Sequence, residues 1–363
     1  MVQEWRLLNL SETPWMTSQS IYHALALIQE ELEIPNTLII TWPNQPFVCI
    51  GLHQVIENSV EIEYLKESNL PYIRRACGGG SVYLDQNQVF YQIICRKEDY
   101  PQQLEDFYQL FLEPVVQTYR DFNIEAKYSP INDIIAEGRK ISGNGAVTYG
   151  ESRVLVGNFI FDFPASEMSR ILKVPEEKFR DKIAKSLEER MGSFRFFLDK
   201  IPSKDEVISR FIENFQKSLN INMNSGELTT EEAQKVREIE RSYQEKSWIY
   251  YVEKEGDELF QQKIKSGTYF SYNEKKFPGG LMQLFIHFED DCIEEIVITG
   301  DFTISPPFVL TQLQEELSKQ PVSKNKLNNR IEELFTNLRI DLPGIETEDI
   351  TDLILDTYEK IRK

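Results

Sequence analysis

Hydrophobic residues recur at two spacings along the chain, and the spacing indicates which segments are helices and which are strands. Residues 18–31 carry apolar side chains at every third or fourth position, which is typical of a helix with one buried face. Residues 38–42 and 47–51 are short β-branched and aromatic runs separated by prolines, and they predict the two strands of a hairpin. A longer helix is expected at residues 103–122. The first third of the chain therefore mixes helices with strands.

Two capping boxes mark helix starts later in the chain. Ser203 to Glu206 and Thr229 to Glu232 each place a hydroxyl three residues before a glutamate and ahead of an apolar stripe. Residues 131–163 show apolar bursts broken by glycines, which predict a meander of strands. The turn-like residues 224–226 are the first candidate for a domain boundary.

The last third of the chain predicts a second, smaller unit. Alternating apolar and polar residues from Trp248 onwards, through Lys263 and Lys265 to Phe288, indicate a small antiparallel sheet. Helical spacing follows at residues 310–317 and 325–338, and again in the tail. The pattern predicts an α+β fold, with mixed or antiparallel sheets flanked by helices. We expect a first domain over residues 1–240, a second α+β domain over 241–345 and a terminal helix over 346–363.

Composition and charge narrow the classes of function. The 363 residues are 41% hydrophobic and 27% charged, which suits a globular protein with a sizeable core. A net charge of −19 repels a phosphate backbone, so general nucleic-acid binding is not expected. Neither a membrane span nor a signal-peptide pattern is recognisable, and the expected location is cytoplasmic. The four cysteines lack a CxxC spacing, and the three histidines lack a metal-ligand spacing, which disfavours a disulfide frame or a zinc site.

The strongest chemical signal is a glycine-rich segment that two arginines precede, Arg74 to Tyr83. Bare glycine backbone lets amide N–H groups approach phosphate oxygens, and a nearby arginine adds charge-assisted contacts. The three glycines alone are equally compatible with a flexible hairpin or a bulge. The spacing matches neither a Walker loop nor a Rossmann fingerprint.

A second signal is Asn132-Asp133 followed by Gly138 to Ala146, where Lys140 stands among small residues. A lysine on an exposed face is usually a solvated charge. Among glycines, however, an ammonium group can lie close to an anion and stabilise charge in a transition state. Together the two segments favour a site that handles anions.

These segments resemble the lipoate-protein ligase A family. The resemblance is carried by Arg-Arg-x-x-Gly-Gly-Gly-x-Val-Tyr-x-Asp at residues 74–85, and by Asn-Asp and Arg-Lys-Ile-Ser-Gly at residues 132–133 and 139–143. It extends to Gly-Leu-His-Gln at residues 51–54 and to residues 154–163. The part of the chain around Gly-Asp-Phe at residues 300–302 resembles the accessory domain of the larger members.

The resemblance implies a biotin/lipoate ligase-like fold and a two-step reaction. Lipoate or octanoate would be activated with ATP and Mg²⁺ to an acyl-adenylate, and the acyl group would pass to a lysine of a lipoyl-domain acceptor. Acceptors of this kind are the E2 subunits of 2-oxoacid dehydrogenases and the H protein of glycine cleavage. Lys140 inherits the catalytic role, and Asp133 a weak contact to Mg²⁺. The implied substrate and nucleotide contacts are Arg75, Ala76, Cys77, Gly78, Gly79, Gly80, Ser81, Val82, Tyr83, Leu84, Asn132, Asp133, Lys140, Ser142, Gly143, Gly145, Ala146, Gly157 and Asn158.

The sequence departs from the family pattern at several of these positions. Leu84 stands where many members have a histidine, Val156-Gly157-Asn158 replaces His-Gly-Thr, and Cys77 replaces a small hydroxyl residue. Gly145 lengthens or loosens the lysine loop. Each departure removes or alters a polar contact to lipoate or AMP.

Three other functions stay open at this point. An octanoyl or lipoyl transferase of the same fold passes the acyl group through a cysteine thioester, and Cys77 is the candidate because no cysteine occurs between Cys95 and Cys292. A biotin ligase has a related fold but a different motif pair. A non-catalytic homologue would bind lipoate or a lipoyl domain without turnover.

Overall fold

The computed structural model describes residues 3–174, 179–252, 268–289 and 291–360. Its first unit is built around a six-stranded sheet with the strand order β10-β11-β6-β2-β1-β12. The sheet is mixed, because β1 runs parallel to both β2 and β12 while the other neighbours are antiparallel. Its strands are β1 (Gln3–Thr13), β2 (Thr37–Pro43), β6 (Gln88–Arg96), β10 (Asn144–Tyr149), β11 (Ser152–Ile160) and β12 (Ile221–Ser225).

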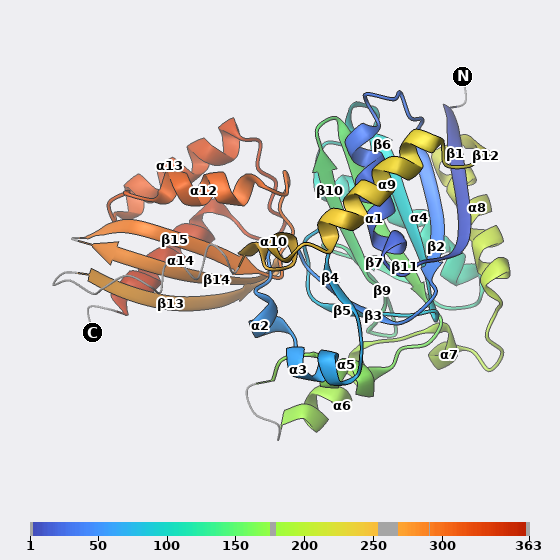
Figure 1. Ribbon diagram of the computed structural model, residues 1–363, viewed down its shortest axis with the longest axis horizontal. Helices are drawn as coiled ribbons and strands as arrows, with labels where there is room; N and C mark the ends of the chain where they lie inside the picture. Colours follow the sequence, from blue (N-terminus) through green and yellow to red (C-terminus); the bar gives the residue numbers. More distant parts are fainter. Residues whose placement is uncertain (1–2, 175–178, 253–267, 290, 361–363) are drawn as a thin grey trace.

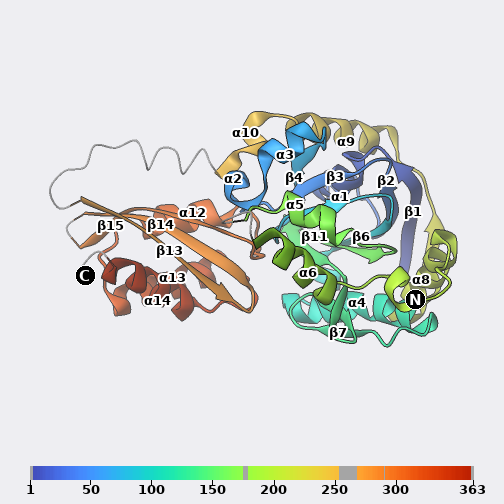
Figure 2. The same cartoon turned by 90° about the horizontal axis from the view of Figure 1, so that it is seen from below.

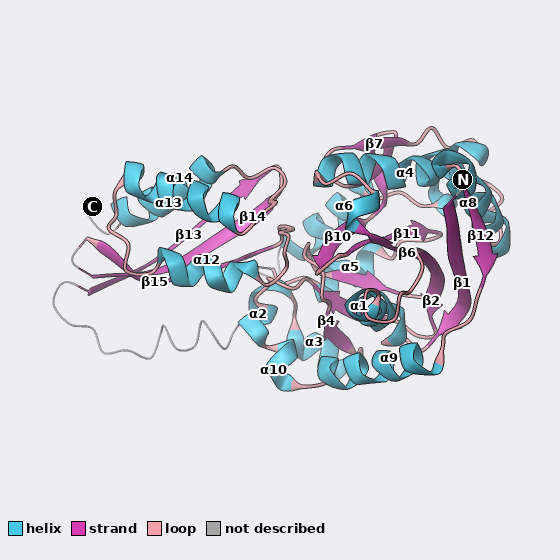
Figure 3. Ribbon diagram, turned by 90° about the horizontal axis from the view of Figure 1, so that it is seen from above, coloured by secondary structure: helices cyan, strands magenta, loops and turns pink. Residues whose placement is uncertain are grey.

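Helices cover both faces of this sheet, as Figure 3 shows. The helices α4 (Leu104–Asp121) and α8 (Lys204–Leu219) pack on one face, and α1 (Thr17–Ile28) and α9 (Thr230–Tyr243) lie on the other. Both expected capping boxes are present, at the starts of α8 and α9. The expected helices at residues 18–31 and 103–122 are confirmed by α1 and α4.

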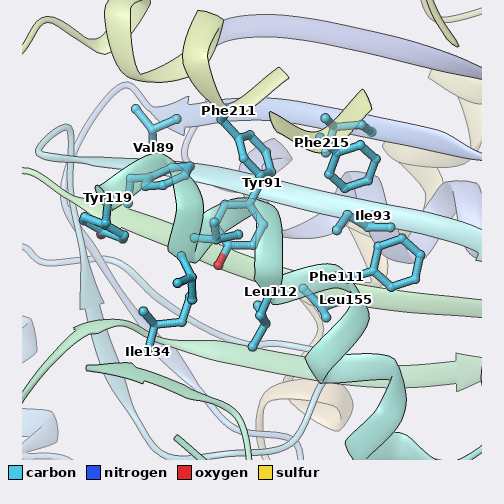
Figure 4. Close-up of a cluster of buried hydrophobic side chains, with 14 of the residues drawn as sticks. Val89, Tyr91, Ile93, Phe111, Leu112, Tyr119, Ile134, Leu155, Phe211 and Phe215 are labelled. Atoms are coloured by element: carbon cyan, nitrogen blue, oxygen red, sulfur yellow. The ribbon is translucent and has the colours of Figure 1, made fainter. Parts of the chain in front are cut away.

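The core beneath α4 and α8 is rich in aromatic rings (Figure 4). Tyr91 of β6 lies 5.2 Å from Phe211 of α8, measured between ring centroids, and Phe111 of α4 lies 6.0 Å from Phe215. Burial of each such side chain contributes roughly 1.5–3 kcal/mol. Because side chains alternate along a strand, the neighbours of Tyr91 on β6 face α1 instead.

Two smaller sheets complete the strands of the first unit. One has the order β4-β3-β5 and the other β7-β8-β9. The hairpin expected for residues 38–42 and 47–51 is wrong: β3 leaves β2 and pairs with β4 and β5. The meander expected at residues 131–163 is split between two sheets, because β8 pairs with β9 and β10 pairs with β11. These strands are β3 (Phe47–Ile50), β4 (Tyr72–Arg74), β5 (Val82–Leu84), β7 (Lys127–Ser129), β8 (Asp133–Ala136) and β9 (Arg139–Ser142).

Short helices connect these strands on the surface of the first unit (Figure 1). The strand expected from Trp248 is wrong, since Trp248 lies in the short helix α10 and stacks on Tyr243 at 5.2 Å. Lys263 and Lys265, which were expected in the same sheet, lie outside the described residues. The short helices are α2 (Ile56–Ser59), α3 (Ile62–Glu67), η1 (Lys97–Asp99), α5 (Ala165–Ile171), α6 (Arg180–Arg190), α7 (Phe194–Phe197) and α10 (Lys246–Ile249).

The second unit is a three-stranded antiparallel sheet with helices packed on it. It has its own hydrophobic core, to which the last helix, α14, contributes Ile350, Leu353 and Ile354. The α+β class with a smaller second unit is confirmed, while the bounds at residues 240 and 345 stay a prediction. The elements are β13 (Thr268–Phe277), β14 (Gly280–Glu289), β15 (Cys292–Gly300), α12 (Val309–Leu317), α13 (Lys324–Asn337) and α14 (Thr347–Glu359).

The two units touch at the glycine-rich loop of the first (Figure 2). The N–H of Gly79 donates to the carbonyl of Phe302 at 3.2 Å, and the N–H of Gly300 donates to the carbonyl of His53 at 2.9 Å. The His53 ring also stacks on Phe302, with 5.5 Å between centroids. Loops of the second unit are thereby held beside the glycine-rich loop. No helix among the described residues has the length and apolar character to span a membrane.

Candidate functional site

The glycine-rich segment forms a loop between β4 and β5, and the Arg75 side chain holds this loop by hydrogen bonds to its carbonyl groups. The Nη2 atom of Arg75 donates to the carbonyls of Gly78 and Gly80 at 2.7 and 2.9 Å, and Nη1 donates to the carbonyl of Cys49 at 3.3 Å. Gly79 has φ +91°, a conformation that strains residues with a Cβ. The loop therefore has a fixed shape, with a positive charge at its base.

Arg74 holds a second loop against the first. It is fully buried, and its Nη1 atom donates to the carbonyls of Gly51, Leu52 and Gln54 at 2.6 to 3.0 Å. The two loops approach so closely that a Cβ on Gly51 would lie 1.7 Å from the carbonyl oxygen of Gly79. The sequence assigned Arg74 no separate role, and the structure makes it a brace for the glycine-rich loop.

Lys140 and Asp133 come from neighbouring strands of the small sheet β7-β8-β9 and form an ion pair. The Nζ atom of Lys140 lies 2.6 Å from Oδ1 of Asp133, and both side chains are partly exposed. A Cβ on Gly143 would lie 4.0 Å from the same Nζ atom, so the backbone leaves room beside the ammonium group. An anion can therefore approach Lys140 while Asp133 holds its position.

A network of polar side chains fixes the segment that carries Asp133. The Nδ2 atom of Asn132 donates to the carbonyl of Asn144 at 2.5 Å, and the Nδ2 atom of Asn144 donates back to the carbonyl of Asn132 at 2.8 Å. The hydroxyl of Tyr91 donates to Oδ1 of Asn144 at 2.5 Å and also contacts the Ser142 hydroxyl at 3.0 Å. The Asn-Asp segment and the loop after Lys140 are thus locked together.

A chain of amides connects the lysine loop to the end of the glycine-rich loop. The N–H of Gly143 donates to Oδ1 of Asn158, and Nδ2 of Asn158 donates to Oε1 of Gln88, at 2.9 and 2.7 Å. The Nε2 atom of Gln88 then donates to the carbonyl of Tyr83 at 3.1 Å. Asn158, one of the departures from the family pattern, therefore positions both motifs relative to each other.

The two motifs face one cavity of about 440 Å³. Its walls are the glycine-rich loop, the Lys140 segment, strands β6 and β11, and the start of α1. The second unit closes one side with its residues 276–280 and 301–303, of which Pro278, Gly279, Gly280 and Thr303 are part of the wall. Lys276 and Asp301 also line the cavity, and the Nζ atom of Lys276 lies 3.2 Å from Oδ1 of Asp301.

Most of the residues expected at the site lie on this wall. Four residues are exceptions. Ala76 and Ala146 are buried behind the wall, where Ala76 accepts a hydrogen bond from Tyr149 and Ala146 accepts one from the Cys77 thiol. Ser142 contacts Tyr91 instead of the cavity. Tyr83 is the fourth exception and packs against the hydrophobic cluster beside β3. The expected residues on the wall are Arg75, Cys77, Gly78, Gly79, Gly80, Ser81, Val82, Leu84, Asn132, Asp133, Lys140, Gly143, Gly145, Gly157 and Asn158.

The cavity wall also contains residues that the motifs did not indicate. Phe90 and Gln92 lie on β6, which is buried on both faces over Gln88–Cys95, so its pattern does not indicate which face lines a cavity. Lys276 and Asp301 come from the second unit, and the glycines beside them at residues 279–280 and 300 were the only local signal. The others are Gln19, Cys49, Asn144, Val156, Pro278, Gly279, Gly280 and Thr303.

The two cysteines at the cavity are buried, and the charged group beside both thiols is the Arg75 guanidinium, which stays protonated and cannot accept a thiol proton. Burial raises the pKa of the Cys77 thiol to about 11, although Arg75 opposes this effect. Burial likewise raises the pKa of Cys49. Because the thiolate is the reactive form, a raised pKa disfavours nucleophilic attack near neutral pH.

Carboxylates at the cavity are suited to a magnesium ion that arrives with phosphates. Mg²⁺ usually binds one or two carboxylates together with substrate oxygens and water. Asp133 and Asp301 both line the cavity, and among the described residues Oδ1 of Asp133 has no hydrogen-bond partner apart from its ion pair with Lys140. The described residues contain no cluster of three or more His, Cys, Asp or Glu side chains that would hold a metal alone.

Comparison with known families accounts for both units. Residues 20–216 match the model of the lipoyl protein ligase A/B catalytic domain. The chain belongs to the lipoyl protein ligase A/B family. Residues 268–354 match the bacterial lipoate protein ligase C-terminus, so the second unit corresponds to the accessory domain of this family. The resemblance inferred from the glycine-rich and Lys140 motifs is therefore confirmed.

Curated relatives include both ligases and transferases. The chain is 26% identical to the lipoate-protein ligase LplJ of Bacillus subtilis over 331 residues, covering 90% of this chain and 93% of the relative. It is 22% identical to the octanoyltransferase LipM of Kyrpidia tusciae over 274 residues, covering 69% of this chain and 99% of the relative. Family membership alone thus leaves open whether the acyl group is activated with ATP.

Solved structures show the same fold. A bipartite lipoate protein ligase from Thermoplasma acidophilum, studied with its E2 lipoyl domain, has a TM-score of 0.62 and 27% identity, and covers 72% of this chain and 100% of that chain. A lipoate-protein ligase A bound with ATP has a TM-score of 0.58 and 25% identity, and the match covers 68% of this chain and 98% of that chain. The expected biotin/lipoate ligase-like fold is confirmed.

Proposed function

We propose that this protein is an ATP-dependent lipoate-protein ligase. In the first step a carboxylate oxygen of lipoate, or of a similar medium-chain acid, attacks the α-phosphorus of ATP, and pyrophosphate leaves. In the second step the ε-amine of an acceptor lysine attacks the acyl carbonyl, loses a proton, and AMP leaves. The observation that carries this proposal is the ammonium group of Lys140, fixed by Asp133 in one cavity with the glycine-rich loop.

Lys140 is suited to the first step because two anions must meet there. A carboxylate and a phosphate repel each other, and a fixed ammonium group between them lowers that repulsion. The three glycines of the loop carry no Cβ, so its backbone can lie close to phosphate oxygens, although the N–H of Gly79 itself donates to the carbonyl of Phe302. Mg²⁺ bound with the nucleotide would supply further neutralisation of phosphate charge, and Asp133 with Asp301 would hold it. The ATP-bound relative supports this assignment of the nucleotide.

The acceptor is expected to be a lipoyl domain. The relative from Thermoplasma acidophilum was characterised with its E2 lipoyl domain, and this supports an acceptor of the same kind here. Lipoate-dependent release of pyrophosphate from ATP tests the first step without any acceptor. A well-folded protein that releases no pyrophosphate with lipoate or octanoate would instead fit a non-catalytic binding protein.

Replacement of Cys77 by serine is expected to leave most ligase activity intact. The thiol is buried, its pKa is raised to about 11, and it donates only to the carbonyl of Ala146, at 3.6 Å. A serine keeps a donor for that carbonyl, with a loss of activity of roughly threefold at most. Acceptor labelling with ATP and lipoate measures this. An inactive C77S, together with ATP-independent transfer from an acyl carrier by the wild type, would favour the thioester transferase.

Lys276 is expected to strengthen nucleotide binding from the second unit. Its ammonium group lies at the cavity and is exposed, so its neutralisation should raise the KM for ATP roughly two- to fivefold with little change in kcat. The variant is Lys276→Gln. Lys275→Gln is the matched control, since the Nζ atom of Lys275 lies 5.0 Å from the centre of the Phe277 ring and off the cavity wall. Equal KM values for ATP in the two variants would show that Lys276 does not contribute to nucleotide binding.

A further inference from the structure

The register of the six-stranded sheet shows where the cavity ends. On the face toward α1, Phe90 of β6 lies opposite Asn158 of β11, and both line the cavity. Two residues further along, Gln92 lies opposite Val156, and these also line it. The next pair on this face, Ile94 with Val154, is buried in the hydrophobic core instead. We call each such pair of opposite residues on β6 and β11 a row. The row of Gln92 and Val156 is therefore the inner end of the cavity.

Lys140 lies at the other end of this wall. The N–H of Gly143, which is close to the Lys140 ammonium group, donates to Asn158 in the row of Phe90. Neighbouring rows on one face of a strand are roughly 7 Å apart. A carboxylate bound at Lys140 would thus send its acyl chain past Phe90 toward Gln92. Only 1% of the Gln92 surface is exposed, whereas about a third of the Lys140 side chain is.

The amide of Gln92 has one partner and one free acceptor. Its Nε2 atom donates to the carbonyl of Ser18 at 2.6 Å. This contact fixes the orientation of the amide, because the reversed orientation would set two carbonyl oxygens against each other. The Oε1 atom is buried and has no hydrogen-bond partner among the described residues. A buried acceptor without a donor is costly, so a ligand that supplies a donor is favoured at this point.

We propose that Gln92 makes this cavity selective for a medium-chain acid whose far end carries a hydrogen-bond donor. The inference rests on the proposed function, which places the acid's carboxylate at Lys140. A thiol of a reduced dithiol chain or a terminal hydroxyl would donate to Oε1 of Gln92, while Phe90 and Val156 contact the apolar part of the chain. An unsubstituted alkyl chain such as octanoate would leave the buried acceptor unsatisfied, and so would the closed dithiolane ring of oxidised lipoate, which has no S–H; both acids remain substrates but are used less efficiently than an acid with the donor.

Gln29 provides a matched control in the same part of the fold. It is also 1% exposed, and its amide nitrogen and oxygen both lack partners among the described residues. It caps the end of α1 and does not line the cavity. Gln29→Leu therefore removes a buried amide of the same kind without altering the cavity wall.

The experiment compares octanoate with ω-hydroxyoctanoate, whose hydroxyl provides the donor. Both acids are supplied to the full-length protein with MgATP, and kcat/KM is measured by pyrophosphate release. The wild type is expected to favour ω-hydroxyoctanoate by roughly tenfold or more. Gln92→Leu should bring the ratio to about one or below, while Gln29→Leu should keep the wild-type ratio. Gln92→Met, which is unbranched and of similar length, replaces the leucine variant if that protein does not fold.

Two results would overturn the proposal. One is a wild type that uses octanoate as well as, or better than, ω-hydroxyoctanoate. The other is a folded Gln92 variant with the same selectivity as the wild type. If the wild type releases no pyrophosphate with any acid, the proposed function fails by itself, and calorimetric binding of the two acids then decides the role of Gln92 in the same way.

Discussion

Replacement of Lys140 by alanine is expected to abolish acyl-adenylate formation. Loss of one preorganised charge at a reacting centre costs on the order of a hundredfold or more in rate. The side chain is partly exposed, and its polar contact is the ion pair with Asp133, so the fold should be retained. Pyrophosphate release with lipoate and MgATP measures the effect.

Lys140→Ala also leaves the Asp133 carboxylate unpaired, and this effect must be separated from the loss of the ammonium group. Without Lys140, the carboxylate of Asp133 loses its ion-pair partner and repels both the acid and the phosphates. The double variant with Asp133→Asn removes that repulsion, but it lacks both the ammonium group and one of the two carboxylates proposed for Mg²⁺, so we expect it to stay inactive. Lys127→Ala, at the exposed first residue of strand β7 in the same small sheet, is the control and should be fully active. Normal adenylate formation by Lys140→Ala would end the assignment of Lys140 as the catalytic cation.

Replacement of Gly79 by alanine is expected to weaken ATP binding on the order of tenfold. Gly79 has φ +91°, and an added Cβ would lie 2.9 Å from Nη2 of Arg75. That nitrogen holds the carbonyls of Gly78 and Gly80, so it cannot move away without releasing the loop. The affinity for ATP is measured by calorimetry.

The control for this variant separates backbone strain from damage to the site. Gly150 also has a positive φ of +55°, but nothing lies within 4 Å of an added Cβ there. Gly150→Ala should therefore lower stability by a similar amount, roughly 1 kcal/mol, and leave ATP binding unchanged. If Gly79→Ala bound ATP as tightly as Gly150→Ala does, the glycine-rich loop would be only a turn.

Local signals in the sequence were sufficient for most helices but not for strand partners. The capping boxes at Ser203 and Thr229 act within one helical turn, and both helices begin where they indicate. The partner of a strand is set by residues far away in the chain. The strand Phe47–Ile50 follows β2 closely in sequence, yet it pairs with β4 and β5. Its side chains are divided between two hydrophobic clusters, one shared with the main sheet and α1 and the other with α2 and α3.

The candidate site was predictable where a short stretch of sequence by itself indicated anion binding. Three consecutive glycines and a lysine among glycines are such stretches, and both segments face the same cavity. The place of Gln92 in the cavity wall was not predictable, because it depends on which face of β6 lines the cavity and on where the cavity closes. Lys276 was not predictable because the second unit brings it to the cavity from 136 residues away along the chain from Lys140.

Mass spectrometry of an acceptor protein shows whether the acyl group is activated with ATP. A recombinant lipoyl domain is incubated with the protein and lipoate with and without MgATP, and in parallel with an octanoyl acyl carrier without ATP. We expect the acceptor lysine to gain a lipoyl group only when ATP is present, with AMP formed in equal amount. Labelling from the acyl carrier without ATP, and none from lipoate with ATP, would contradict the account.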